Sequence, residues 1–330
     1  MNNPLLIIAR VALVLALVVI VLGAYVRLSD AGLGCPDWPG CYGNLLVPDH
    51  VDAGNENLAV RPLEQAKAWK EMVHRYVAST LGFLILIMAV MAGVKSSLSG
   101  MRGFSLALLV LVIFQGMLGM WTVTLLLKPV IVMSHLLGGL TILSLLCWTV
   151  LRQQSKQGVF VSARYSNLLP IVIFAIIVLV LQISLGGWTS SNYAALACPD
   201  FPTCQGVWWP NMDFKEGFIL WRGLGIDYEG GVLLGPARTA IHMAHRIGAI
   251  ITFFTIFYVA MQAIRSGVQQ LKLTGIISLI LLITQVTLGI ANIKFHIPLP
   301  VAVSHNGVAA LLLLSLVTLL HHCLPEKQPN

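Results

Sequence analysis

The sequence contains few charged residues for its length. Only 10% of its 330 residues are Asp, Glu, Lys or Arg, and 57% are hydrophobic. A soluble domain carries roughly 25% charged residues, so this composition excludes an ordinary water-soluble protein. The formal net charge of +7 therefore does not indicate nucleic acid as a partner. We expect an integral membrane protein whose main surroundings are lipid.

Cysteine is also scarce. Six cysteines are too few for a disulfide scaffold in a chain of this size. Four of them form two C-x5-C pairs, Cys35 with Cys41 and Cys198 with Cys204, in polar segments. If these segments lie outside a bacterial inner membrane, the oxidising compartment favours a disulfide in each pair. We expect the disulfides to pin their loops. A redox-active pair is the alternative, and zinc binding lacks a neighbouring histidine.

Long apolar runs dominate the rest of the chain. Each run is long enough to cross about 30 Å of hydrocarbon at about 1.5 Å per residue. No small-residue cleavage site follows the first run, so we interpret it as a membrane helix and not as a signal peptide. The predicted fold is all-α, with eight membrane helices over residues 6–27, 72–94, 103–125, 129–151, 167–189, 238–264, 271–293 and 299–322.

Basic residues are distributed unevenly between the two sides of the predicted membrane region. The short outer turns hold only Lys128 and Lys294 if the N-terminus is cytoplasmic. The inner side then collects Arg10, Lys95, Arg102, Arg152, Lys156, Arg164, Arg265, Lys272 and Lys327. This asymmetry predicts a multi-pass inner-membrane protein with a cytoplasmic N-terminus and two long outer loops, 28–71 and 190–237. An interfacial aromatic belt is expected at the outer side from Trp38, Trp121, Trp188, Trp208 and Trp209.

The sequence contains an internal repeat that divides it into two related halves. Cys35-Pro-Asp-Trp-Pro-Gly-Cys41 returns as Cys198-Pro-Asp-Phe-Pro-Thr-Cys204, and Ser134-His135 returns as Ser304-His305. Four predicted helices separate corresponding residues, so both halves would share one orientation in the membrane. We therefore expect two pseudo-symmetric four-helix bundles, formed by residues 1–160 and 161–330.

Four histidines, His74, His135, His245 and His305, occupy matching places in these halves. Ionisable residues inside a membrane are costly and are candidate functional residues. Each histidine lies about one to two turns inside the outer end of its helix, so each bundle would present two imidazoles at one depth. Haem iron accepts a neutral imidazole on each face. The pattern predicts a haem site in each bundle, without a C-x-x-C-H motif for covalent attachment. A lone histidine would more often make a hydrogen bond between helices.

Residues beside these histidines fit such a haem. Arg75 and Arg246 directly follow the first histidine of each half. A guanidinium near the membrane surface could pair with a haem propionate, so both are candidate propionate partners. Glycines would let a flat macrocycle approach the helices, although glycine is also common at ordinary helix contacts. The glycines concerned are Gly82, Gly138, Gly139, Gly248 and Gly307.

The halves differ at one informative position. Three residues before the first histidine, the first half has Glu71 and the second half has His242. Residues three apart lie on one helix face, so a carboxylate would border the first haem site. It could act as a base or stabilise developing positive charge. The alternative is an acid favoured by the dipole at a helix start, and the residues alone do not decide between the two.

The combined pattern resembles the haem A synthase family. The motif Glu71-x-x-His74-Arg75 opens the second predicted helix, histidines stand on the fourth, sixth and eighth, and a cysteine pair lies in the first outer loop. The resemblance covers nearly the whole chain. It implies an oxidoreductase that oxidises a ring methyl of haem O to a formyl group, giving haem A for terminal oxidases.

The resemblance also implies roles for the site residues. His74 and His135 would flank the substrate haem, His245 and His305 would ligate a resident haem b, and Glu71 would be catalytic. The first cysteine pair would have a redox role, and haem O synthase would deliver the substrate. The rival interpretation is a di-haem b-type electron carrier of the quinol oxidoreductase type, which would not need the carboxylate. The electron acceptor and the oligomeric state, including a homo-oligomer, stay open.

Overall fold

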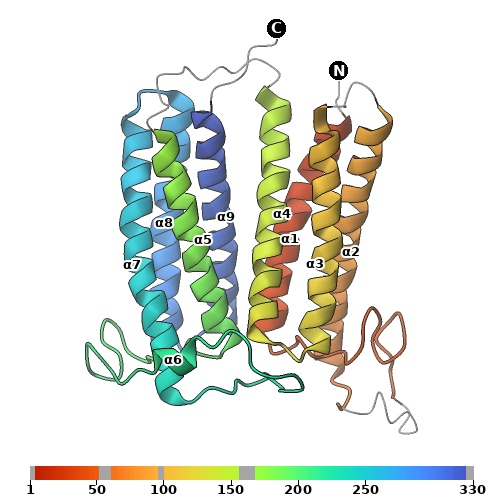
Figure 1. Cartoon of the computed structure of the whole chain (residues 1–330), viewed down its shortest axis with the longest axis vertical. Coiled ribbons are helices and arrows are strands. Elements are labelled where there is room, and N and C mark those ends of the chain that lie inside the picture. Colours follow the sequence, from red (N-terminus) through yellow and green to blue (C-terminus); the bar gives the residue numbers. More distant parts are fainter. Residues whose placement is uncertain (1–3, 52–60, 96–99, 156–167, 325–330) are drawn as a thin grey trace.

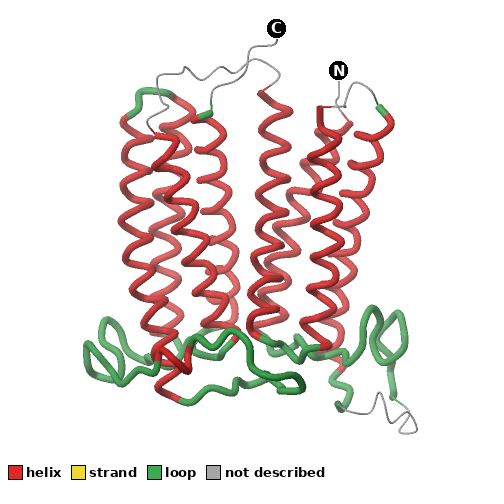
Figure 2. The backbone as a smooth tube through the Cα atoms, viewed as in Figure 1, coloured by secondary structure: helices red, strands yellow, loops and turns green. Residues whose placement is uncertain are grey.

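The fold is all-helical in the part of the chain that the computed structural model describes, residues 4–51, 61–95, 100–155 and 168–324. No strand forms within these residues (Figure 2). The helices are α1 Pro4–Leu28, α2 Gln65–Val94, α3 Arg102–Thr124, α4 Pro129–Ser155, α5 Leu169–Ser191, the short α6 Phe214–Gly217, α7 Gly235–Arg265, α8 Gln269–Lys294 and α9 Leu299–Cys323. Apart from α6, each is long and apolar enough to cross a membrane.

Each of the eight predicted membrane spans is a helix, which confirms the predicted fold class. The largest difference in bounds is at α2, which begins at Gln65 and not at residue 72. The added stretch, Gln-Ala-Lys-Ala-Trp-Lys-Glu, consists largely of good helix formers but is too polar to extend an apolar run. Consequently Glu71 lies well inside α2, and no acid is present in the first turn of that helix. The interpretation of Glu71 as a helix-start acid is therefore wrong.

The long helices form two bundles that stand side by side (Figure 1). In the first bundle, α1 and α3 each pack against both α2 and α4. In the second bundle, α7 and α9 each pack against α8 and α5. The bundles meet through the pairs α1–α9, α4–α9 and α4–α5. The arrangement fits the predicted pair of four-helix bundles, and the domain boundary predicted at residue 160 lies outside the described residues.

The hydrophobic core is concentrated away from the long loops. In α4 the buried core begins at Leu140, and in α9 it begins at Ala310. Closer to the loops, residues 130–139 of α4 are all half-buried, and none of residues 303–309 of α9 is buried. Both helices pack against four neighbouring helices. The loop-end stretches of these two central helices are therefore less buried than the rest of the same helices.

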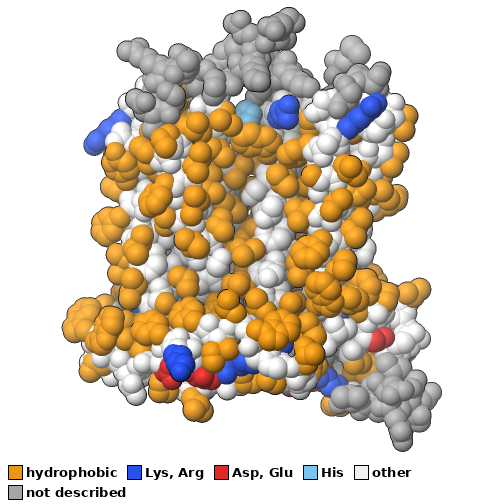
Figure 3. All heavy atoms as spheres, in the orientation of Figure 1, with side chains coloured by type: hydrophobic (Ala, Val, Ile, Leu, Met, Phe, Trp, Pro, Cys, Tyr) orange, Lys and Arg blue, Asp and Glu red, His pale blue; other side chains and the backbone are white. Residues whose placement is uncertain are grey.

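The two ends of the molecule differ in structure. Both long loops, α6 and both cysteine pairs lie at one end, called the loop end below, and the described chain begins and ends at the other (Figure 1). On the face in Figure 3, hydrophobic side chains cover the middle and charged side chains lie near the two ends. This layout is that of a multi-pass membrane protein. Three of the basic residues assigned to the inner side, Lys156, Arg164 and Lys327, lie outside the described residues.

One tryptophan departs from the expected interfacial belt. Trp188 is only 3% exposed, and its indole Nε1 donates a hydrogen bond to the carbonyl of Gly217 at 2.9 Å. Trp208 and Trp209, by contrast, are exposed in the second long loop. A buried indole with a satisfied N–H packs as a core residue, so Trp188 fixes α6 to the second bundle instead of facing lipid.

Candidate functional site

The four predicted histidines all lie near the loop end. His74, His135, His245 and His305 belong to α2, α4, α7 and α9. Each of these helices starts at the loop end, and each histidine falls within about its first three turns. His74 and His135 are close enough to interact electrostatically, and so are His245 and His305. The structure thus brings one pair together in each bundle, as the sequence predicted.

A glycine on the preceding membrane helix backs every one of these imidazoles. A Cβ on Gly23 of α1 would stand 3.1 Å from Cε1 of His74, and on Gly119 of α3 it would stand 3.3 Å from Cε1 of His135. In the second bundle, the corresponding separation is 3.2 Å both from Gly186 to His245 and from Gly289 to His305. These contacts are tighter than ordinary carbon contacts, so a side chain there would push the ring aside. Glycine at these four places sets the ring positions.

The imidazoles have the properties expected of iron ligands. Nδ1 of His74, of His135 and of His305 is buried without a hydrogen-bond partner among the described residues. A buried polar nitrogen without a partner is costly and requires an explanation. Each of the four histidine residues is nevertheless half-buried as a whole, near the less buried stretches of α4 and α9. Within the described ranges, no three His, Cys, Asp or Glu side chains gather into a metal cluster. A haem supplies its own ring nitrogens and needs only the pair, so these residues fit a haem.

Glu71 ties the first disulfide loop to α2. Its Oε2 accepts a hydrogen bond from the backbone N–H of Cys35 at 2.9 Å, and its Oε1 accepts one from Nη2 of Arg75 at 2.6 Å. The Glu71 residue is only 4% exposed. A hydrogen bond to a charged acceptor contributes about 1.5–3 kcal/mol, so this clamp is a substantial local interaction. The carboxylate is held in one place, one turn before His74 and directly beneath the disulfide.

His242 takes the same place in the second bundle. Its Nδ1 accepts the backbone N–H of Cys198 at 3.4 Å, and Nε of Arg246 lies 3.2 Å from its Nε2. Both distances are longer than the corresponding distances at Glu71. His242 also offers Cys198 and Arg246 a ring nitrogen in place of a carboxylate oxygen. The two loops are therefore fastened by equivalent residues, with a carboxylate in one bundle and an imidazole in the other.

Both arginines hold backbone carbonyls of the disulfide loops. Nη1 of Arg75 lies within hydrogen-bond distance of the carbonyls of Asp37 and Pro39, at 3.0 and 3.2 Å. Nη1 of Arg246 donates to the carbonyl of Thr203 at 2.8 Å, and its Nη2 donates to that of Asp200 at 2.7 Å. The sequence reasoning missed this loop-holding role. Pairing of the two guanidiniums with haem propionates stays a prediction.

The cysteines pair as predicted. Disulfides join Cys35 to Cys41 and Cys198 to Cys204, whereas Cys147 and Cys323 are free and buried. Each disulfide closes a loop that an aspartate also stabilises. In the second loop, Asp200 accepts hydrogen bonds from the hydroxyl of Thr203 and from the backbone N–H groups of residues 205 and 206. These bonds, the one from Thr203 foremost, lower the pKa of Asp200 from 3.8 to about 2.

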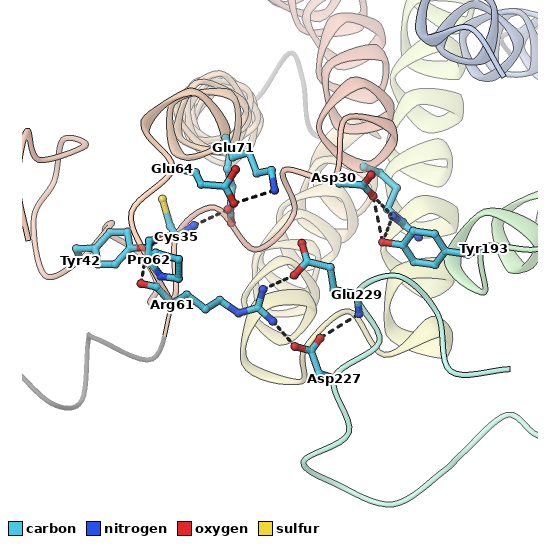
Figure 4. A network of polar contacts seen from close by, with 12 residues as sticks. Asp30, Cys35, Tyr42, Arg61, Pro62, Glu64, Glu71, Tyr193, Asp227 and Glu229 are labelled. Atoms are coloured by element: carbon cyan, nitrogen blue, oxygen red, sulfur yellow. Dashed lines mark hydrogen bonds and ion pairs between the residues drawn. The ribbon is translucent and has the colours of Figure 1, made fainter. Parts of the chain in front are cut away.

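The second long loop crosses over to the first bundle. Arg61, from the first loop, forms ion pairs with Asp227 and Glu229 of the second (Figure 4). Nζ of Lys128, at the start of α4, donates to the carbonyl of Gly223 at 2.8 Å. The Lys128 residue is only 2% exposed, and this burial lowers its pKa. Residues 221–229 therefore pack on the turn between α3 and α4 and on the first loop, at the loop end of the first bundle. The sequence predicted only that this loop lies outside the membrane.

Comparison with known proteins places the chain in a family. The family model described as COX15-CtaA, cytochrome oxidase assembly protein, matches residues 7–317. The chain belongs to this family. It is 48% identical over 313 residues to the heme A synthase of Shewanella oneidensis, with 94% of each chain covered. Heme A synthases of Rhizorhabdus wittichii and Halalkalibacterium halodurans are 25% and 24% identical. Those matches cover 92% and 91% of this chain and 89% and 90% of the relatives.

Three glutamines of this COX15-CtaA family member also belong to the site, and the sequence reasoning missed them. Gln115, Gln182 and Gln285 each contact one of the four histidines from the neighbouring helix. The available signal was the spacing Gln-x-x-x-Gly, which recurs at Gly119, Gly186 and Gly289 in otherwise apolar helices. Polar side chains within membrane helices are uncommon enough to mark interhelical contacts.

Proposed function

We propose that the chain is a haem A synthase that oxidises a ring methyl of haem O to a formyl group. The observation that carries the proposal is the pair of glycine-backed imidazoles near the less buried loop end of each bundle. Two facing imidazoles are the ligands that a low-spin haem requires. Family membership and the heme A synthase relatives support the same activity.

In this proposal the first bundle is the reaction site. His74 and His135 hold the substrate haem, and Glu71 stands beside them as the carboxylate that the second bundle lacks. Its fixed negative charge would stabilise positive charge that develops at the reacting methyl, or would take a proton from it. Arg75 and the N–H of Cys35 keep this carboxylate in position. Residues 221–229 of the second loop pack on the turn between α3 and α4, at the loop end of this bundle.

The second bundle holds a resident haem b in this proposal, ligated by His245 and His305. When bound, a b-type haem supplies one-electron transfer and would carry electrons away from the first bundle. The chain's own contribution is to fix the two rings, through Gly186 and Gly289, and to keep the disulfide loop closed through Arg246. His242 replaces the carboxylate here, so the second bundle lacks the group that we assign to the chemistry.

The positions of the four histidines favour this function over a transmembrane electron carrier. A carrier that moves electrons across the membrane needs haems near both faces. All four imidazoles instead lie within about three turns of the loop end. We further propose that the loop end faces outward from a bacterial inner membrane, with the N-terminus cytoplasmic, and that haem O synthase delivers haem O through the lipid. Among the short connections between helices, Lys and Arg gather at the opposite end, as Lys95, Arg102, Arg265 and Lys272, against Lys128 and Lys294 at the loop end, and this bias supports the orientation.

Extraction and mass identification of the bound haems test the proposal. Protein produced together with haem O synthase should carry haem b and yield haem A. His245→Ala or His305→Ala should lose haem b, whereas His74→Ala or His135→Ala should keep it and stop haem A formation. His296→Ala, an exposed histidine in a turn, is the matched control and should change neither. Absence of haem absorbance in wild-type protein made with plentiful haem would overturn the proposal, as would normal haem A yield from His74→Ala.

A further inference from the structure

In the second bundle, a glutamine amide reaches a ring nitrogen of each histidine. Nε2 of Gln182 lies 3.0 Å from Nδ1 of His245, and Nε2 of Gln285 lies 3.2 Å from Nε2 of His305. Each glutamine stands one helical turn from the glycine that backs the same ring. The two rings of this bundle are therefore each fixed twice from one neighbouring helix, by a close-packed glycine and by an amide one turn away.

The first bundle lacks both of these contacts between an amide and a ring. Gln115 occupies the place of Gln285, but its Nε2 donates to the backbone carbonyl of His135, at 2.6 Å. Val19 occupies the place of Gln182. Nδ1 of His74 and Nδ1 of His135 are buried with no hydrogen-bond partner in the described part of the chain, and so is Nδ1 of His305, whose Nε2 meets Gln285. Contacts between an amide and a ring are thus present at both histidines of the second bundle and at neither histidine of the first.

Building on the proposed function, we propose that Gln182 and Gln285 are positioning residues that make the haem of the second bundle resident. Their absence around His74, where Val19 stands, makes the first bundle able to bind and release haem. A synthase must keep one haem through many turnovers and exchange the other at every turnover. The two bundles share a ligand set, so the difference must come from the residues around the ligands.

The chemistry of histidine ligation gives the physical reason. A histidine that binds a metal through one nitrogen donates its other N–H to an acceptor, which fixes the ring orientation. Oε1 of Gln182 and Oε1 of Gln285 are buried acceptors that have no partner among the described residues. Rotation of each amide by half a turn exchanges its oxygen and nitrogen, places that oxygen against the ring N–H and leaves the opposite ring nitrogen to the iron. At Gln182 this rotation also ends the bond from Nε2 to the carbonyl of His245, which measures 3.0 Å in this structure. Gly248 makes room for the amide of Gln182, since a Cβ there would collide with Oε1.

The experiment measures how fast each haem leaves the purified full-length protein for excess apomyoglobin. The transfer rate of haem b measures release from the second bundle, and the transfer rates of the farnesylated haems O and A measure release from the first. Loss of such an outer hydrogen bond typically lowers metal affinity about 10- to 100-fold. We expect Gln182→Leu and Gln285→Leu to speed haem b transfer by about this factor and to alter its low-spin electron paramagnetic resonance signal. Val19→Gln should slow the release of haems O and A.

Two comparisons separate the outcomes. Thr284→Val removes an exposed hydroxyl of α8 that stands next to Gln285 in sequence and donates to the carbonyl of Ile280, so it should leave the haem b transfer rate and signal unchanged. Circular dichroism and gel filtration identify a variant that fails to fold, in which case Val19→Gln alone decides. Unchanged haem b transfer in folded Gln182→Leu and Gln285→Leu would overturn the inference, and so would unchanged release from Val19→Gln. In either case the proposed function stands if wild-type protein still holds haem b through His245 and His305. Wild-type protein without haem would instead overturn the proposed function.

Discussion

Glu71 and His242 occupy equivalent places in the two bundles, and each accepts the backbone N–H of the first cysteine in its disulfide loop. The distance is 2.9 Å to the carboxylate and 3.4 Å to the imidazole. One position therefore serves the same structural purpose in both halves, while only the first half places a negative charge there. Any catalytic role for Glu71 is superimposed on this fastening role, so a test must separate the two.

Glu71→Gln separates them because the amide keeps the size and an oxygen acceptor for the N–H of Cys35. If the charge is needed for the chemistry, haem A formation should fall by roughly 10²–10⁴-fold, the usual range for an acid or base catalyst. Haem content should change little, because no imidazole is touched. The ratio of haem O, hydroxylated haem and haem A in cells measures the effect.

Glu71→Ala supplies the comparison, because it removes both the charge and the acceptor. The first disulfide loop should then become more accessible to protease, while Glu71→Gln leaves the loop protected. Normal haem A yield from Glu71→Gln would show that the residue only fastens the loop.

The glycines behind the histidines predict the effect of adding a single methyl group. Gly289→Ala would place a Cβ 3.2 Å from the ring of His305, so the ring must move and haem b binding should weaken. Gly116→Ala is the control, because a Cβ there meets nothing within 4 Å. Alanine also favours helix over glycine by up to about 1 kcal/mol. The haem-to-protein ratio should therefore fall for Gly289→Ala alone, and equal ratios would show that these rings are not tightly held.

Mass spectrometry under non-reducing conditions checks the cysteine pairs. Peptides should link Cys35 to Cys41 and Cys198 to Cys204 in protein whose thiols are trapped at lysis. Serine in place of the second pair should lower the folded yield more than the turnover of each folded molecule, because His242 adds no catalytic charge beside that loop. Normal folded yield with lost turnover in the second-pair variant would show that the chemistry does not belong to the first bundle alone.

Local patterns in the sequence predicted much of the fold and of the site. The apolar runs specify the eight spans because lipid demands about 20 apolar residues per helix. The four histidines stand out because an imidazole in such a run is costly. The start of α2 was not predictable by this means, since its first turns are polar and rest on the disulfide loop.

The features that the sequence did not reveal depend on distant partners. Gln182 is a polar residue in an apolar run, but only the packing of α5 on α7 shows that it meets the ring of His245. Burial of Trp188 likewise depends on α6 folding back to offer the carbonyl of Gly217. No local pattern pairs Arg61 with Asp227, because the two residues lie 166 positions apart, in different loops.

The pH response of the second disulfide loop follows from Asp200. Its pKa is about 2 in the folded protein, below the ordinary 3.8. A carboxylate with a lowered pKa stabilises the folded loop above its ordinary pKa, and this contribution is lost as the pH falls toward the folded value. Hydrogen exchange at residues 204–207, corrected for intrinsic rates, should therefore rise between about pH 4 and pH 2. Asp200→Asn should show fast exchange throughout, and a pH-dependent step that persists in this variant would point to another group.

The last prediction concerns the contact between the two loops over the first bundle. Arg61 bridges Asp227 and Glu229, and the segment also rests on Lys128 and on the carbonyl of Leu126, which accepts the N–H of Tyr228 at 3.1 Å. Ion pairs that are partly exposed contribute about 0–1 kcal/mol each, so Arg61→Ala should not unfold the protein.

Arg61→Ala should instead raise protease cleavage within 221–229 several-fold and lower haem A yield, because the segment detaches from the first bundle more often. Haem b content, which reports the second bundle, should stay at the wild-type level. Lys67→Ala is the matched control, since the ion pair that Lys67 makes within the described residues is with Glu64, at the exposed start of its own helix. Equal cleavage of the two variants would mean that Lys128 and Tyr228 hold the segment without Arg61. A loss of haem b in Arg61→Ala would mean that the loops support both bundles and not the first alone.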